Sequence, residues 1–223
     1  MQTVSCGSLW TGRGQCLSNV SVNIDDDGMI LSIEESSTPP AAFDFHFGMP
    51  SFVDAHVHYS WMVVKEASVD LSDISSADEL LSVLRSKVLC KEGGIVRGES
   101  FDESDWFDSD LPSISQLDHV TGEVPVFLRR VCGHTALVNS AMLRLIDSDV
   151  PGVNRSTGVL KEWPVLNFEQ MFPLPGRVLA DAVSRVDSKM FSKGVTAVCS
   201  FESIHTAELL LNSFSALDVS VAV

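Results

Sequence analysis

The spacing of hydrophobic residues changes near residue 48. In the first 48 residues apolar and polar positions alternate, as they do at Val20, Val22 and Ile24, and the turn-forming run at 25–28 separates this stretch from the apolar run at 29–33. Alternation at a period of two, with turns between the runs, predicts a small β unit over residues 1–48. After residue 48, short apolar runs alternate with segments of helical period, so we expect a second unit of the α/β class over residues 49–223.

The second unit is expected to alternate strands and helices. Ser76 and Glu79 form the capping-box pattern S-x-x-E, and the apolar residues after them follow one face of a helix. The predicted strands lie at 51–55, 94–98, 125–131, 195–200 and 219–223, and two further helices are predicted at 178–190 and 203–214. This order favours a parallel sheet or barrel, in which functional groups collect at the carboxyl ends of the strands.

Charge and cysteine content narrow the function classes. The chain has 223 residues, and its 15 Lys and Arg against 30 Asp and Glu give a net charge of −15. Such an excess of negative charge repels phosphate groups, which argues against nucleic acid or an anionic membrane surface as a partner. The five cysteines form no C-x-x-C pair, and the sequence has neither a run of about 18 apolar residues nor a secretory leader pattern. We therefore expect reduced thiols and a cytoplasmic protein without a membrane span.

The sharpest local motif closes the predicted strand at 51–55. In the run Asp54-Ala55-His56-Val57-His58, the two histidines are two residues apart and therefore share one face of a strand. Two imidazoles from such positions can hold one metal ion, and Asp54 on the same face could orient one of them. A bare His-x-His also occurs as two exposed or hydrogen-bonded histidines, so its position at the end of an apolar strand is what favours a metal site.

Several motifs follow one another in the order found in a known family. Residues 48–58 resemble the first barrel strand of the amidohydrolase superfamily, which has a Pro-Gly-Phe-(Ile/Val)-Asp-x-His-x-His run. Four later stretches, at 96–102, 125–140, 157–162 and 194–198, are similar to the amidohydrolase 3 branch, which includes N-substituted formamide deformylases. Five matches in order are far more specific than any one of them.

The resemblance implies a fold, a metal and a reaction. It implies a β-sandwich segment at 1–48, a (β/α) barrel of the TIM type, and one or two divalent metal ions that activate water to hydrolyse an amide-like, non-peptide C–N bond in a small molecule. Zinc is the first expectation, and His and carboxylate ligands also suit Fe, Mn, Ni or Co. His56 and His58 would be the first ligands, with Glu162 of the branch's Thr-Gly-x-Leu-x-Glu motif as a carboxylate ligand. The alternative for Glu162 is an ordinary surface residue.

Three further residues are expected to bind substrate by the same resemblance. His134 follows the predicted strand at 125–131, where it could contact the substrate or stabilise an oxyanion. Asp102 and Trp106 match the branch's Gly-x-x-(Trp/Phe)-Asp pattern and the Trp that follows it, and would line the pocket. The alternatives are a hydrogen-bonded structural histidine, a solvated acidic loop and a packed aromatic ring.

Parts of the family pattern have no match in the sequence. Two later histidines and a late Asp, which serve the family as metal ligands and proton shuttle, have no counterpart, so the catalytic acid/base is not identified. The 175 residues from 49 to 223 also fall short of the roughly 250 of a full barrel. We therefore expect an incomplete barrel, as in a truncated chain with little or no activity of its own. A degenerate or truncated non-catalytic homologue that needs a partner to fold, a plain α/β binding module and a homo-oligomer all stay open.

Overall fold

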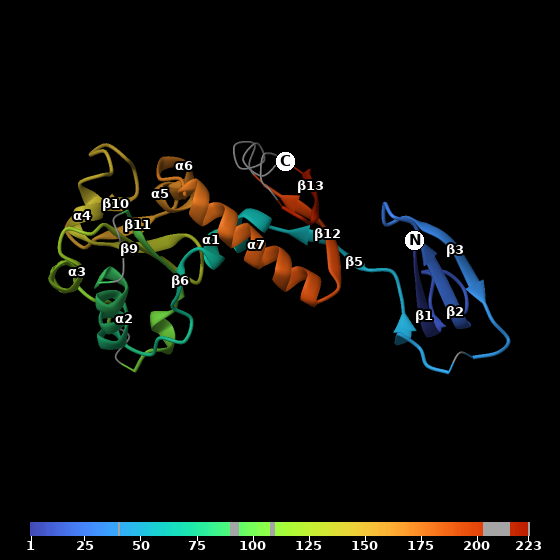
Figure 1. Cartoon of the computed structure of the whole chain (residues 1–223). Coiled ribbons are helices and arrows are strands. Elements are labelled where there is room, and N and C mark those ends of the chain that lie inside the picture. The colour runs from blue at the N-terminus through green and yellow to red at the C-terminus, as the bar shows by residue number, and fades with distance from the viewer. Residues whose placement is uncertain (40, 90–93, 108–109, 203–214, 223) are drawn as a thin grey trace. The chain divides into compact units, whose positions relative to one another are not determined.

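The structure, a computed structural model, describes residues 1–39, 41–89, 94–107, 110–202 and 215–222 (Figure 1). The chain forms two compact units, the first made of residues 1–53 with 194–196 and the second of residues 54–193 with 197–223. The helix predicted at 203–214 lies outside the described residues. Within the described ranges, no helix is long and apolar enough to cross a bilayer.

The first unit is built around a four-stranded sheet with the order β3-β2-β1-β4. Its strands are β1 (Gln2–Leu9), β2 (Leu17–Ile24), β3 (Ile30–Glu35) and β4 (Phe45–Gly48). The predicted turn between β2 and β3 forms because the Asp25 carboxylate accepts the N–H groups of Asp27 and Met29, while Gly28 adopts a φ of +84°. The alternation of residues 20–24 thus does correspond to a strand.

The second unit contains a six-stranded mixed sheet with the order β10-β11-β9-β8-β7-β6. Its strands are β6 (Val69–Asp70), β7 (Val96–Phe101), β8 (Val126–Arg130), β9 (Thr135–Val138), β10 (Val153–Asn154) and β11 (Val159–Lys161). The pairs β6–β7 and β7–β8 are parallel, whereas β8–β9, β9–β11 and β10–β11 are antiparallel. The predicted parallel arrangement fails after β8 because only residues 131–134 join β8 to β9, too few for the crossover that parallel strands need.

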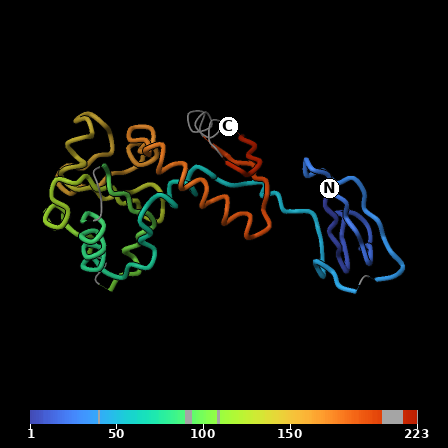
Figure 2. Tube along the Cα trace, viewed as in Figure 1, coloured from blue at the N-terminus to red at the C-terminus, as the bar shows by residue number. Residues whose placement is uncertain are grey.

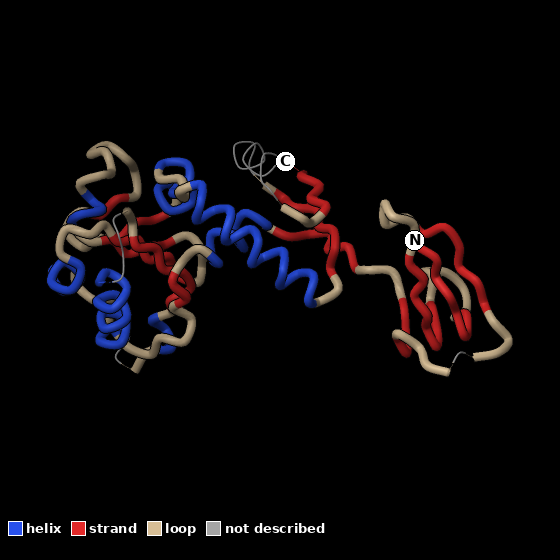
Figure 3. The backbone as a smooth tube through the Cα atoms, viewed as in Figure 1, coloured by secondary structure: helices blue, strands red, loops and turns tan. Residues whose placement is uncertain are grey.

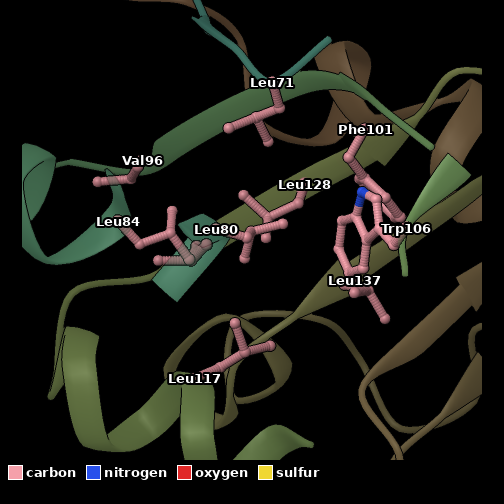
Figure 4. Close-up of a cluster of buried hydrophobic side chains, with 10 residues drawn as sticks. Leu71, Leu80, Leu84, Val96, Phe101, Trp106, Leu117, Leu128 and Leu137 are labelled. Atoms are coloured by element: carbon pink, nitrogen blue, oxygen red, sulfur yellow. The ribbon is translucent and has the colours of Figure 1, made fainter. Parts of the chain in front are cut away.

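Helices cover one face of this sheet. The helix predicted from the capping box is α2 (Ala77–Leu89), and Ser76 Oγ accepts the Glu79 N–H at 3.2 Å. Together with α3 (Ile114–Thr121), it packs against the apolar face of β7 and β8 (Figure 4). The buried cluster there consists of Leu71, Leu80, Leu84, Val96, Phe101, Trp106, Leu117, Val126, Leu128 and Leu137. Each fully buried Leu in it stabilises the fold by roughly 1.5–3 kcal/mol relative to an exposed one.

A third sheet has the order β13-β12-β5, with β5 (Phe52–Val57), β12 (Val195–Phe201) and β13 (Asp218–Ala222). Beside it lie α1 (Tyr59–Glu66) and the predicted long helix α7 (Gly176–Ser192), which pack together in Figures 1 and 2. The buried Tyr59 hydroxyl donates to Asp187 at 2.5 Å and ties α1 to α7.

The remaining helices are short (Figure 3): the 3₁₀ turn η1 (Glu103–Asp105), α4 (Ser140–Leu143), α5 (Trp163–Leu166) and α6 (Phe168–Met171). The expected mixed α/β class is confirmed, but the strands of the described residues form three separate sheets, and no closed barrel is seen among them.

Candidate functional site

Strand β5 delivers two histidines at its carboxyl end. The ring centroids of His56 and His58 lie 5.8 Å apart, with the ring planes nearly perpendicular at 89°. Both side chains are exposed. The two imidazoles thus lie beside one another at the end of a strand, the position that the residue spacing predicted.

The end of β12 orients both rings through Phe201. His58 Nδ1 lies 2.6 Å from the Phe201 carbonyl oxygen. Because a carbonyl oxygen only accepts, this bond places the proton on Nδ1 and leaves the Nε2 lone pair of neutral His58 available to a metal ion. The Phe201 ring stacks on His56, with centroids 4.2 Å apart. Sequence reasoning missed Phe201, since its neighbour in space is about 140 residues earlier in the chain.

The expected role of Asp54 takes a different form. Asp54 Oδ1 accepts the backbone N–H of His56 at 3.1 Å. The hydrogen bond that orients a histidine ring is instead made by His58, whose Nδ1 contacts the backbone carbonyl of Phe201. Backbone carbonyls and carboxylates are both common partners of metal-binding histidines, so the arrangement at His58 is compatible with a metal ligand.

A second pair of polar side chains joins β9 to β11. His134 Nδ1 lies 3.0 Å from Glu162 Oε2, and the Glu162 N–H donates to the His134 carbonyl at 2.8 Å. The two residues meet because Thr135 and Lys161 are paired in the β9–β11 ladder. Both side chains are more than half exposed.

Glu162 has a strained backbone. Its φ of +58° and ψ of −111° lie in a region that non-glycine residues rarely adopt. Such strain costs about 1–3 kcal/mol and concentrates at functional sites. Asn19 and Ser100 share a positive φ, so the role of Glu162 as a metal ligand stays a prediction.

Trp61 lies between the two pairs. Its ring centroid is 6.2 Å from that of His58. Its Cη2 would come within 2.8 Å of a Cβ atom placed on Gly133, the residue before His134. Within the described ranges, however, no three His, Cys, Asp or Glu side chains form a group that could hold a metal ion. The structure therefore pairs His56 with His58 and Glu162 with His134, without gathering the three predicted ligands.

The other two predicted substrate contacts have structural partners. Asp102 accepts hydrogen bonds from the Ser104 hydroxyl and backbone and pairs with Arg130 at 2.7 Å. The Ser104 hydroxyl, with a smaller contribution from Arg130, keeps the pKa of Asp102 below its ordinary value. Trp106 is only 4% exposed, and its indole N–H donates to the Ile74 carbonyl. Their roles at the substrate stay predictions.

Behind Trp61 lies a buried charge network that sequence reasoning did not identify. Arg129 Nη1 lies 3.2 Å from Glu99 Oε1, and Arg129 Nη2 donates to both Glu169 oxygens at 2.9 Å. Burial raises the pKa of Glu99 to about 7, and Arg129 opposes this shift. The guanidinium carbon of Arg129 lies 5.7 Å from the Trp61 ring centroid. Charged residues alternating with apolar ones at 96–99 are the sequence signal that could have revealed this second, polar face of β7.

Comparisons with known proteins agree with this fold. N-substituted formamide deformylase of Arthrobacter pascens is 34% identical over 103 residues, which cover 44% of this chain and 19% of that enzyme. Protein LONG AFTER FAR-RED 3 of Arabidopsis thaliana is 34% identical over 98 residues, 44% of this chain and 17% of that protein. An uncharacterized metal-dependent hydrolase of Pyrococcus furiosus matches 99% of this chain with a TM-score of 0.72 at 22% identity. This chain spans 50% of that structure's length.

A family model also matches most of the chain. The amidohydrolase family model (Amidohydro_3) matches residues 47–213, which include the His56–His58 pair and the His134–Glu162 pair. The resemblance inferred from the ordered motifs is confirmed, and the chain belongs to the amidohydrolase family.

Proposed function

We propose that this chain contributes His56 and His58 to the metal centre of a hydrolase that cleaves a non-peptide C–N bond in a small amide. The observation that carries the proposal is the bond from His58 Nδ1 to the Phe201 carbonyl, with the His56 ring 5.8 Å away. This bond prepares Nε2 of His58 as a ligand without further rearrangement of the ring. Zinc is the first choice, and Fe, Mn, Ni and Co also suit imidazole ligands.

The two histidines are a ligand type that divalent metal ions bind, but two ligands are fewer than a metal site needs. Catalytic zinc centres usually have about three protein ligands, and within the described residues no third one adjoins the histidine pair. Glu162 is the proposed carboxylate ligand because it closes the family's Thr-Gly-x-Leu-x-Glu motif, although its carboxylate contacts His134 and not the histidine pair in this structure. A bound ion would supply Lewis-acid polarisation of the amide carbonyl and would acidify water.

We propose that His134 binds the substrate. With Nδ1 directed at the Glu162 carboxylate, a neutral His134 carries its proton on Nδ1 and has its lone pair on Nε2. When protonated, His134 can donate a hydrogen bond from Nε2 to a substrate oxygen, with Glu162 balancing the charge. The similarity to the N-substituted formamide deformylase of Arthrobacter pascens supports an N-substituted formamide or a related small amide as substrate.

Equilibrium dialysis against zinc, followed by elemental analysis, tests the proposed ligands. We expect zinc to bind to the wild-type chain and to be lost from the double variant His56→Ala/His58→Ala. His119→Ala, which removes an exposed histidine of α3, is the matched control and should keep the zinc. Equal zinc content in the wild type and the double variant would contradict the proposal.

A non-catalytic homologue is a second candidate, because no complete ligand group is present in the described part of the chain. The two candidate functions differ in the amount of zinc that the purified protein should bind. A metal site predicts zinc bound at a fixed ratio to protein, whereas the non-catalytic homologue predicts none. We expect little or no hydrolysis by the 223-residue chain alone, and strong zinc-stimulated turnover would refute that expectation.

A further inference from the structure

Trp61 occupies a position that both halves of the candidate site share. It lies in the first turn of α1, three residues after His58, and is 47% exposed. Its ring neighbours the His58 ring on one side and the Gly133 backbone, next to His134, on the other. The Trp61 ring is therefore next to both the histidine pair and the turn that leads into His134.

Gly133 keeps room for the indole. A Cβ atom at this position would approach Trp61 Cη2 to 2.8 Å, and the residue also has a φ of +76°. Both the contact and the backbone conformation exclude larger residues there. The turn between β8 and β9 is thus shaped to let the indole approach the backbone.

The buried network holds the indole in place. Arg129, 4% exposed, lies against the Trp61 ring while Glu99 and Glu169 hold its guanidinium group. A guanidinium group over an indole contributes about 0.5–2 kcal/mol, depending on its desolvation. The exposed part of the ring therefore offers an apolar surface, and the contact with Arg129 reduces the side-chain entropy lost on binding.

We propose that Trp61 is a specificity-determining residue that binds the apolar N-substituent of the substrate, and that the site selects N-aryl or bulky N-alkyl amides over unsubstituted ones. This inference rests on the proposed function. Phe201, whose ring stacks on His56, and Trp163, the residue after Glu162 in the chain, are also partly exposed and support an apolar substituent. The amide group, in contrast, requires the polar histidines.

Binding of formanilide and of formamide to the zinc-treated chain tests this inference. The four tryptophans give four indole N–H signals in a proton–nitrogen NMR spectrum, and Trp61→Phe assigns the signal of Trp61. We expect formanilide, and not formamide, to shift that signal. Trp61→Ala should weaken formanilide binding about tenfold, and Trp61→Phe about threefold or less, because a phenyl ring keeps part of the stacking surface. Trp10→Ala, an exposed tryptophan of the first unit, is the control and should leave the affinity unchanged.

Zinc content measured on the same samples separates the two proposals. If zinc binds through His56 and His58 while Trp61→Ala binds formanilide as tightly as the wild type, the role of Trp61 is refuted and the metal site stands. If zinc does not bind but formanilide still shifts the Trp61 signal, the metal site fails and the apolar contact stands. Absence of formanilide binding to the wild type overturns the inference, and loss of binding in Trp61→Phe equal to that in Trp61→Ala contradicts its aromatic basis.

Discussion

Replacing Glu99 by Gln should change how the stability of the second unit depends on pH. Glu99 is 7% exposed, and burial raises its pKa from the ordinary value of 4.5 to about 7. The folded chain therefore keeps this proton to a higher pH than the unfolded chain does, so the free energy of unfolding falls as the pH rises between these two values. This difference in protonation corresponds to about 3 kcal/mol, most of which falls between about pH 5 and about pH 8.

Urea unfolding followed by circular dichroism at about pH 5 and about pH 8 measures this difference. Because Gln does not titrate, we expect Glu99→Gln to gain about 2–3 kcal/mol relative to the wild type between the two pH values. Glu123→Gln, which changes an exposed glutamate of the same unit, is the matched control. A parallel pH dependence of Glu99→Gln and the wild type would refute the argument. A relative loss at the higher pH would show that the ion pair with Arg129 outweighs the burial of the carboxylate.

Three substitutions test the backbone and the core by the same unfolding measurement. Ser100→Gly should stabilise the chain by about 0.5–1 kcal/mol, because Ser100 has a φ of +73° that glycine adopts without strain. We expect this relief of strain to exceed the conformational entropy that glycine adds to the unfolded chain. A loss of stability would show that this backbone is unstrained. Gly158→Ala should cost about 3 kcal/mol or more, because the new Cβ would lie 2.3 Å from the Val138 carbonyl oxygen at a φ of +71°. An unchanged midpoint would mean that the turn can shift. Leu128→Ala, in the buried cluster of β8, should cost about 2–5 kcal/mol, and a cost below about 1 kcal/mol would contradict its core position.

Local sequence patterns predicted the individual helices and strands better than they predicted which strands pair and in which direction. The helical period and Gly194 predicted α7, and the apolar runs predicted β5, β8 and β12. The antiparallel half of the large sheet was not predicted, because a short apolar run contains no information about the direction of its neighbour. That direction follows from the length of each connection and from contacts between distant residues.

The same limit applies to the candidate site. His56 and His58 are two residues apart, so their proximity follows from the geometry of a strand. The contact of His134 with Glu162 depends on the register of β9 and β11, which no local pattern reveals. Trp106, for which both a pocket-lining role and a packed aromatic ring were considered, is buried in the apolar cluster, and its indole N–H donates to Ile74, 32 residues earlier in the chain.

A zinc titration followed through the imidazole nitrogens tests the central claim most directly, namely that His56 and His58 hold a divalent ion. In a long-range proton–nitrogen NMR spectrum, we expect the signals of His56 and His58 to shift together, while His58 keeps the proton on Nδ1 that it donates to Phe201. The signals of the exposed His46 and His119 should stay in place. Zinc that leaves the His56 and His58 signals unchanged, or that shifts His46 and His119 equally, would contradict the account.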